Sequence, residues 1–176
     1  PLRHFRAIIS VVLPNLIRAL SEHWQEIAAE AIRRIRRDKS LPEMSRYPEA
    51  NLRERARAIL EHLDAFLTSS ESEIAEHYER LGKTRFEEGV RLHELVRSLQ
   101  IVKRSMLEYA GRQGITGPLD AYAEEELEFA VDRMFDRMIY SVVRGYERAF
   151  REAPSRFGSM IPKPQKEPEF RGPSPF

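Results

Sequence analysis

The chain has 176 residues, and its 29 Lys and Arg residues almost balance its 28 Asp and Glu residues, so it provides no global field to attract nucleic acid or an anionic membrane. The absence of cysteine excludes disulfides, thiolate nucleophiles, cysteine zinc sites and iron–sulfur clusters. The lack of cysteine fits a reducing cytoplasm, and no apolar run approaches the roughly 20 residues of a membrane span, so a cytoplasmic protein without a membrane segment is predicted.

The first predicted helix is long and amphipathic and ends near Lys39. Pro14 fits its first turn, where the missing N–H costs nothing. A separate helical arm is predicted before it, over residues 1–12. The apolar stripe of the long helix recurs at spacings of three and four and consists of Leu13, Leu16, Ile17, Leu20, Trp24, Ile27, Ala31 and Ile35.

The next two predicted helices are placed by capping signals. After a loop with two prolines, Asn51 is expected to be an N-cap, with Glu54 at the position that completes a capping box. Ser70 and Glu73 repeat this spacing before a helix that is expected to run to about Glu88.

Gly89 is expected to stop or bend the chain, and the most regular apolar stripe begins after it at Leu92. A loop with three glycines and a proline separates this helix from the last one, which is expected to start near Asp120. The predicted apolar face of the last helix consists of Leu127, Val131, Met134, Phe135, Met138, Val142, Tyr146 and Phe150.

No segment alternates as a β-strand would, so the predicted fold class is all-α. Five to six helices are expected, in a globin-like arrangement or a related helical bundle. The predicted helical domain covers residues 13–152. Residues 153–176 carry six of the eleven prolines and no periodicity, which predicts a disordered tail or linker.

The sequence lacks the local motifs of common enzyme classes. It contains no glycine-rich phosphate loop, no His-Glu-x-x-His pair and no serine nucleophile elbow. We therefore predict that the protein is not an enzyme, with no catalytic residue, no metal site and no cofactor.

Two polar residues are candidates for a ligand pocket. His77 lies roughly 70° and Arg85 roughly 20° from the centre of the apolar stripe of their helix. His77 is interpreted either as a boundary histidine bonded to a neighbour or as a pocket residue. Arg85 is interpreted either as a structural residue, which caps carbonyls near Gly89 or pairs with an acid across the joint, or as a binding site for an anionic ligand or partner. His93 and His23 lie further from their stripes and are expected at the surface or boundary.

The stretch from Leu81 to Val96, "LGKTRFEEGVRLHELV", is interpreted as a joint between two helices. Gly89 breaks the phase, and Leu92 and Leu95 begin the central helix. Gly82 either allows a close helix approach or is a tolerated weak position.

This joint and its surroundings resemble the signature of the RsbRD-type N-terminal domain, the sensor region of the stressosome RsbT co-antagonist proteins. The same domain also precedes bacterial histidine kinases and transcription regulators. The resemblance covers roughly Leu13 to Arg151. It rests on His77, Leu81, Gly82, Arg85, Gly89, Leu92, Glu94 and Leu95, followed by Lys103 and Arg104.

The resemblance implies a haem-free, globin-like or related helical fold that serves signal input and dimeric interaction. The leading hypothesis is therefore a cytoplasmic bacterial regulatory sensor domain that forms a homodimer and transmits an input through helix packing. Its expected partner is a regulatory protein or an output domain missing from this sequence, and neither nucleic acid nor membrane. Two alternatives stay open: a haem- or small-ligand-binding globin that uses His77 or His93, and a helical protein–protein interaction module that docks through residues 1–12 or the tail.

Overall fold

The computed structural model describes residues 17–68, 71–112 and 118–153. The predicted arm over residues 1–12 and nearly all of the predicted tail lie outside these ranges. The same holds for His4, for the first residues of the predicted long helix, and for Ser70 of the second predicted capping box. These predictions are therefore neither confirmed nor contradicted.

The described residues form helices joined by turns, with no strand among them. A helical segment over residues 17–22 leads into the numbered elements. These are α2 (Trp24–Arg37), the short 3₁₀ helix η1 (Met44–Arg46), α3 (Glu49–Thr68), α4 (Glu71–Glu87), α5 (Leu92–Arg112) and α6 (Pro118–Glu152). The predicted all-α bundle is confirmed, whereas its globin-like character stays a prediction.

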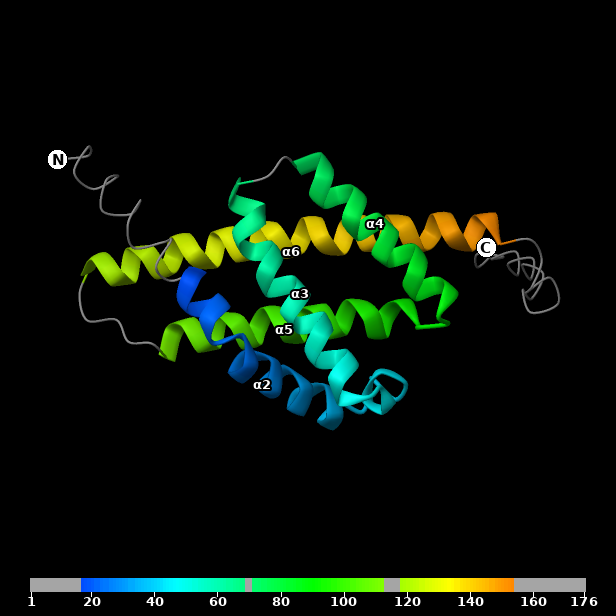
Figure 1. The fold of residues 1–176 in the computed structure, drawn as a ribbon, viewed down its shortest axis with the longest axis horizontal. Helices are drawn as coiled ribbons and strands as arrows, with labels where there is room; N and C mark the ends of the chain where they lie inside the picture. Colours follow the sequence, from blue (N-terminus) through cyan, green and yellow to red (C-terminus); the bar gives the residue numbers. More distant parts are fainter. Residues whose placement is uncertain (1–16, 69–70, 113–117, 154–176) are drawn as a thin grey trace, which may run out of the picture.

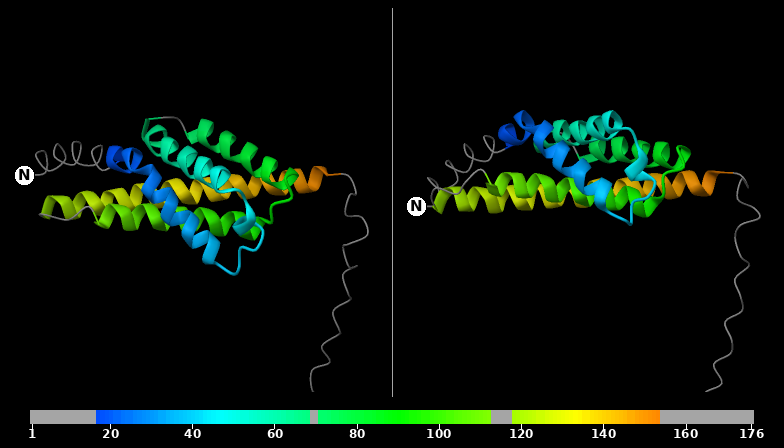
Figure 2. Two further views of the ribbon diagram at one scale, coloured as in Figure 1. Left: turned by 60° about the horizontal axis from the view of Figure 1, so that its bottom comes forward. Right: turned by 90° about the horizontal axis from the view of Figure 1, so that it is seen from below.

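The two longest helices, α5 and α6, run antiparallel beside each other (Figure 1). Helices α3 and α4 lie over one face of this pair, and α2 packs beside α3 and α5 (Figure 2). The apolar stripes of all five helices meet between these layers in one core. The largest fully buried side chains are Tyr78, Phe135, Leu20, Ile27, Leu41, Met44, Leu60, Leu63, Met106, Leu127, Met134 and Met138.

Most of the predicted apolar face of α6 is buried, but its last member is not. The stripe from Leu127 to Val142 lies in the core, and Tyr146 is half-buried against it. Phe150 is 51% exposed, and its ring lies 6.0 Å from that of Phe86 near the end of α4. The expected position of Phe150 on the buried face is therefore wrong, although the residue before it, Ala149, is buried.

The predicted continuous helix up to Lys39 is interrupted at His23. The His23 N–H bonds to the Ala19 carbonyl at 3.0 Å, and the His23 carbonyl then accepts the N–H of Glu26 at 3.1 Å as α2 begins. The turn redirects the chain (Figure 1) and keeps Ile17 and Leu20 in the core together with the stripe of α2. The spacing of the apolar residues continues unchanged through this bend, so the apolar pattern did not indicate the bend.

The predicted N-cap at Asn51 is wrong, because α3 begins two residues earlier. The Pro48 carbonyl accepts the N–H groups of Asn51 and Leu52 at 3.0 and 3.2 Å, so Asn51 already lies in the first turn. Tyr47 is extended, with φ −60° and ψ 143°, as a residue before proline prefers. Proline restricts the residue before it and leads naturally into a first helical turn, so Pro48 places the helix start ahead of the Asn signal.

Helices α4 and α6 cross with their backbones in direct contact. A Cβ atom at Gly82 would lie 2.0 Å from the Val142 carbonyl oxygen, and one at Gly145 would lie 2.0 Å from the Glu79 carbonyl oxygen. Two glycines, one on each helix, thus leave the room for this crossing. The geometry favours the interpretation of Gly82 as a residue that allows close helix approach.

Candidate functional site

The turn between α4 and α5 fixes how the end of α4 is presented. Gly89 has φ 75°, in the left-handed region where glycine carries no Cβ penalty. Its N–H bonds to the Phe86 carbonyl at 2.9 Å, and the Val90 N–H bonds to the Arg85 carbonyl at 3.0 Å, as in a glycine C-cap. The Tyr146 hydroxyl of α6 donates to the Val90 carbonyl at 2.9 Å. The turn is therefore tied to α6 as well as to α4.

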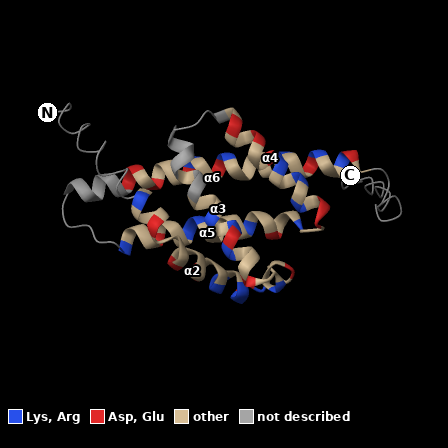
Figure 3. Cartoon of the chain, viewed as in Figure 1, with Lys and Arg blue, Asp and Glu red and all other residues tan. Residues whose placement is uncertain are grey.

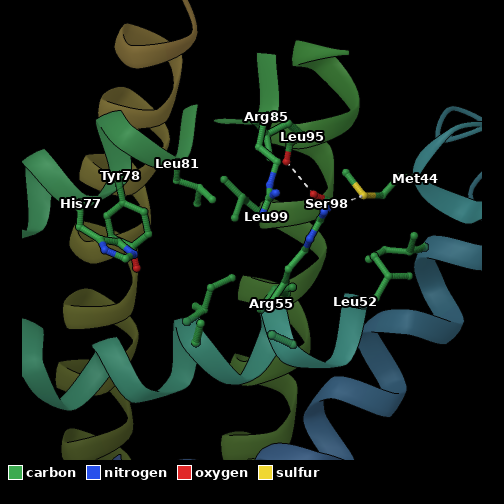
Figure 4. A pocket seen from close by; sticks show the side chains of 15 residues that line it. Met44, Leu52, Arg55, His77, Tyr78, Leu81, Arg85, Leu95, Ser98 and Leu99 are labelled. Carbon is green, nitrogen blue, oxygen red and sulfur yellow. Dashed lines mark hydrogen bonds between the residues drawn. The ribbon is translucent and has the colours of Figure 1, made fainter. Parts of the chain in front are cut away.

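A cavity of about 120 Å³ lies between α3, α4 and α5 (Figure 4). Its wall is mostly apolar, and both of the pocket candidates named from the sequence, His77 and Arg85, lie in it. The other lining residues are Ile35, Met44, Leu52, Arg55, Ala56, Ala58, Ile59, Tyr78, Leu81, Leu95, Ser98, Leu99 and Val102. The remaining motif residues, Gly82, Gly89 and Leu92, are not part of the wall.

Arg85 lies inside the protein, with a side chain that is 12% exposed. Its Nη1 donates to both carboxylate oxygens of Glu88, at 2.7 and 2.6 Å. The acid comes from the next turn of the same chain segment rather than from across the joint. Arg85 is thus paired, but not with an acid across the joint as the sequence interpretation had it, and the guanidinium borders the cavity.

Arg55 is a second cation at this cavity and was not among the candidates predicted from the sequence. Its side chain is 24% exposed, and its Nη2 lies 3.4 Å from the same Glu88 carboxylate. Its Nη1 lies 4.0 Å from the Met44 sulfur, and its guanidinium carbon lies 4.6 Å from the centroid of the Tyr47 ring. Burial lowers the pKa of Arg55, and repulsion from the nearby Arg85 lowers it further.

A signal for Arg55 was present in the sequence. It falls three residues after Leu52 and four before Ile59, on the apolar stripe of α3, where a charged residue needs an explanation. Arg85 occupies the equivalent position on α4. Figure 4 shows the two side chains reaching toward each other from the two helices.

His77 is half-buried, and its ring meets that of Tyr78 edge-on with centroids 5.2 Å apart. Burial of Tyr78 raises the pKa of its hydroxyl well above the ordinary value. His93 is exposed, as expected, and His23 is exposed beside Glu26, with Nδ1 3.2 Å from its carboxylate. The side chain of His62 lies outside the described residues. Among the described histidines, only His77 therefore borders the cavity.

Glu94 is a completely buried acid next to the cavity wall, with 0% exposure. Its Oε2 accepts the backbone N–H groups of Glu43 at 3.0 Å and Met44 at 2.8 Å. This carboxylate therefore holds the start of η1 against α5 and places Met44 at the cavity. Glu94 belongs to the motif on which the family resemblance rests, but no role was predicted for it from the sequence.

A charged network joins α2 to α5 away from the cavity. Arg34 bonds to Glu30 at 2.7 Å and also pairs with Glu108, which accepts from Arg104 at 2.8 Å. The hydrogen bond from Arg34 and then that from Arg104 lower the pKa of Glu108 to about 2. Basic and acidic residues are otherwise interspersed over the described helices, with arginines gathered at the end of α2 (Figure 3).

Grouped metal ligands and membrane-spanning helices are both absent from the described part of the chain. No three His, Cys, Asp or Glu side chains there are grouped as metal ligands would be. None of the described helices is long and apolar enough to cross a membrane.

Comparison with known proteins gives one match. The family model described as "RsbT co-antagonist protein rsbRD N-terminal domain" matches residues 25–157, well over half of the chain. The matched segment contains both cavity arginines, the glycines of the α4–α6 crossing and the buried Glu94. No curated protein and no solved structure matches the chain.

Proposed function

Because this chain belongs to the family of RsbT co-antagonist rsbRD N-terminal domains, we propose that it is a sensor domain that forms a homodimer and transmits an input through helix packing. The family is one of regulatory signalling domains and not of enzymes. A cytoplasmic location and a regulatory protein partner, or an output domain, belong to the same proposal.

One observation supports the proposed mechanism: α4, which borders the cavity, packs with its backbone in direct contact with α6, the longest helix. Arg85 and His77 bring α4 to the cavity wall, and Gly82 of the same helix contacts the backbone of α6. The Tyr146–Val90 hydrogen bond ties the end of α4 to α6 as well. A backbone contact of this kind cannot yield without moving both helices, because no flexible side chain lies between them. A displacement of α4 at the cavity is therefore passed to α6.

The exposed aromatic residues of α6 supply a surface for a second copy. Phe129 is 60% and Tyr140 is 66% exposed. They are eleven residues apart, about three helical turns, so they lie on the same face. Exposed apolar residues on one face are typical of interaction sites.

The charges between these aromatics suit an antiparallel, two-fold symmetric pairing of α6 with itself. Arg133 and Asp136 lie between Phe129 and Tyr140 on that face and are both exposed. A two-fold axis near residues 134 and 135 would place Phe129 of one copy opposite Tyr140 of the other. It would also place Arg133 of each copy opposite Asp136 of the other copy, as an isologous interface requires.

Sedimentation of the purified chain tests the dimer. We expect a dimer in the micromolar range and a monomer for the Phe129→Glu, Tyr140→Glu double variant, because two acids would replace the apolar contact. Arg133→Asp alone should weaken the dimer by placing like charges opposite each other, and Asp136→Arg added to it should restore association. Gln100→Glu, an exposed change on α5, is the control. A wild-type chain that stays monomeric at all these concentrations would refute the proposed dimer.

Transmission to α6 is tested separately by distance measurement. Since the chain has no cysteine, Glu152→Cys provides a unique label site in each copy of the dimer. We expect the distance distribution between the two labels to shift when Ala56→Met fills part of the cavity. The same label distances in a folded Ala56→Met dimer would contradict transmission through α4 and α6.

The two alternative functions receive less support. A cavity of about 120 Å³ is smaller than the roughly 300 Å³ at which cofactor pockets usually begin, so the site does not suit haem. Docking through residues 1–12 concerns a segment outside the described ranges, and no contact of the described helices favours it over the sensor proposal.

A further inference from the structure

We propose that the cavity between α3, α4 and α5 binds a small monocarboxylate with a compact apolar body, whose head group replaces Glu88 between Arg55 and Arg85. This inference rests on the proposed function, since it gives the chemical class of the input that the sensor domain would detect. It is carried by the positions of three charged side chains and by the size and lining of the cavity.

The head-group site already holds a carboxylate. Glu88 places both oxygens within 2.7 Å of Arg85 Nη1, while its Oε2 remains 3.4 Å from Arg55 Nη2. Guanidinium groups bind carboxylates through two parallel hydrogen bonds when the geometry allows it. The two arginines come from different helices, so a carboxylate between them bridges α3 and α4.

Arg55 makes a longer contact with Glu88 than Arg85 does, and it also lies over the Tyr47 ring. Its contacts to Glu88 and to the Met44 sulfur are both long, although its side chain is largely buried. Burial and the neighbouring Arg85 also lower its pKa. A ligand carboxylate that approached Arg55 closely would offset this penalty better than Glu88 does from its present position.

Glu88 is able to leave. Its side chain is 37% exposed, and it lies next to Gly89 at the end of α4. Arg85 is only 12% exposed, but an incoming carboxylate would keep both arginines paired while water solvates the released Glu88. Glu88 therefore behaves as an internal occupant that a better-placed carboxylate can displace.

The cavity limits the rest of the ligand. Leu52, Ile59, Leu81, Leu99 and Val102 give it an apolar wall, and its volume is about 120 Å³. An apolar cavity of about 150 Å³ in another protein holds benzene, so the body has on the order of six carbon atoms. A long acyl chain or a cofactor-sized group does not fit, and a polar body would lose hydrogen bonds to water without replacement.

Calorimetric titration with benzoate tests this class, with benzyl alcohol as a neutral ligand of the same shape and acetate as the head group alone. We expect benzoate to bind and the other two to bind at least about tenfold more weakly, since a hydrogen-bonded charge contributes about that factor. Arg55→Gln and Arg85→Gln should each weaken benzoate binding by a similar factor. Circular dichroism establishes that each variant is folded.

The decisive variant is Glu88→Gln. It removes the internal carboxylate and leaves both arginines in place, so benzoate should bind about tenfold more tightly. Glu87→Gln is the matched control, because it removes the same charge one residue away at an exposed position. An equal gain in both variants would indicate a long-range charge effect and overturn the role of Glu88.

Two further outcomes would overturn the inference. If benzyl alcohol bound as tightly as benzoate, the site would be an apolar cavity with no anion head group. If folded Glu88→Gln bound none of the three probes, the cavity would be no carboxylate site. Neither result would alter the dimer or the label distances. The proposed sensor function is therefore tested separately, by sedimentation and by the distances between labels.

Discussion

Glu94 shows how one side chain positions a wall of the site. A carboxylate with no exposure is rarely found without strong partners, because burial of a charge is costly. Here two backbone N–H groups at the start of η1 supply the partners for Oε2, whereas Oε1 has none among the described residues. The acid thus replaces a capping residue that η1 lacks in its own sequence.

We predict that Glu94→Ala lowers the free energy of unfolding by about 2–4 kcal/mol, since two hydrogen bonds to a charged acceptor are lost and two backbone donors are left unsatisfied. Urea denaturation followed by circular dichroism measures this. Glu43→Gln is the control, because it removes an exposed pair with Arg91 worth less than about 1 kcal/mol. Equal effects of the two changes would show that Glu94 is not the anchor of η1.

Arg85 and His77 were predicted from the sequence as pocket residues, whereas Arg55 and its partner Glu88 were not. The helical wheel brought Arg85 and His77 to the inside of α4, because it needs only the period of that helix. Arg55 lies on the stripe of α3 but was overlooked, and Glu88 lies off the stripe of α4. That both arginines converge on one carboxylate depends on how α3 crosses α4, which no pattern within either helix encodes.

At the scale of elements, the α4–α6 crossing depends on two positions without side chains. Gly82 meets the backbone of Val142 and Tyr146, and Gly145 meets that of Glu79. Arg144 and Arg148 of α6 add ion pairs to the Glu79 carboxylate, at 3.5 and 3.0 Å. The crossing therefore combines close backbone contact with charge pairing at its edge.

Gly82→Ala should lower the free energy of unfolding by more than about 3 kcal/mol, because overpacking against backbone cannot be relieved by a side-chain rotation. Gly89→Ala is the informative comparison. Its Cβ meets nothing within 4 Å, so only the left-handed backbone conformation opposes it, at a cost of about 1 kcal/mol. Thermal and urea unfolding of both variants would measure the difference. If Gly82→Ala were as mild as Gly89→Ala, the two helices would not be in the contact described.

Helix ends were predictable where one local signal acted alone. Gly89 and the restart at Leu92 agree with the observed end of α4 and start of α5. The start of α3 was misplaced because Pro48 and Asn51 are competing signals three residues apart, and the proline prevailed. The bend at His23 leaves the apolar period intact, so it arises from packing of the preceding turn on the core.

For the whole molecule, the all-α class follows from the periodicity, but the layering does not. Each stripe shows which face of a helix is buried and not against which neighbour. The antiparallel α5–α6 pair is favoured by its short connection, whereas the position of α4 across α6 depends on glycines that have no apolar signal.

The last turns of α6 are the part of the molecule on which both the fold and the proposed transmission depend. Val142 and Ala149 are buried there, and Tyr146 holds the joint through Val90.

We predict that a chain ending at Ala153 unfolds with a free energy within about 0.5 kcal/mol of the full chain, since the proline-rich segment after it carries no apolar period. A chain ending at Tyr140 should show no cooperative unfolding, because it lacks Val142, Gly145 and Tyr146 and so loses the whole α4–α6 crossing, while a domain has only roughly 5–15 kcal/mol of net stability. Differential scanning calorimetry of the two truncations distinguishes these outcomes. A cooperative transition in the shorter chain would show that the last turns of α6 are not needed for the core and would contradict transmission through the α4–α6 crossing.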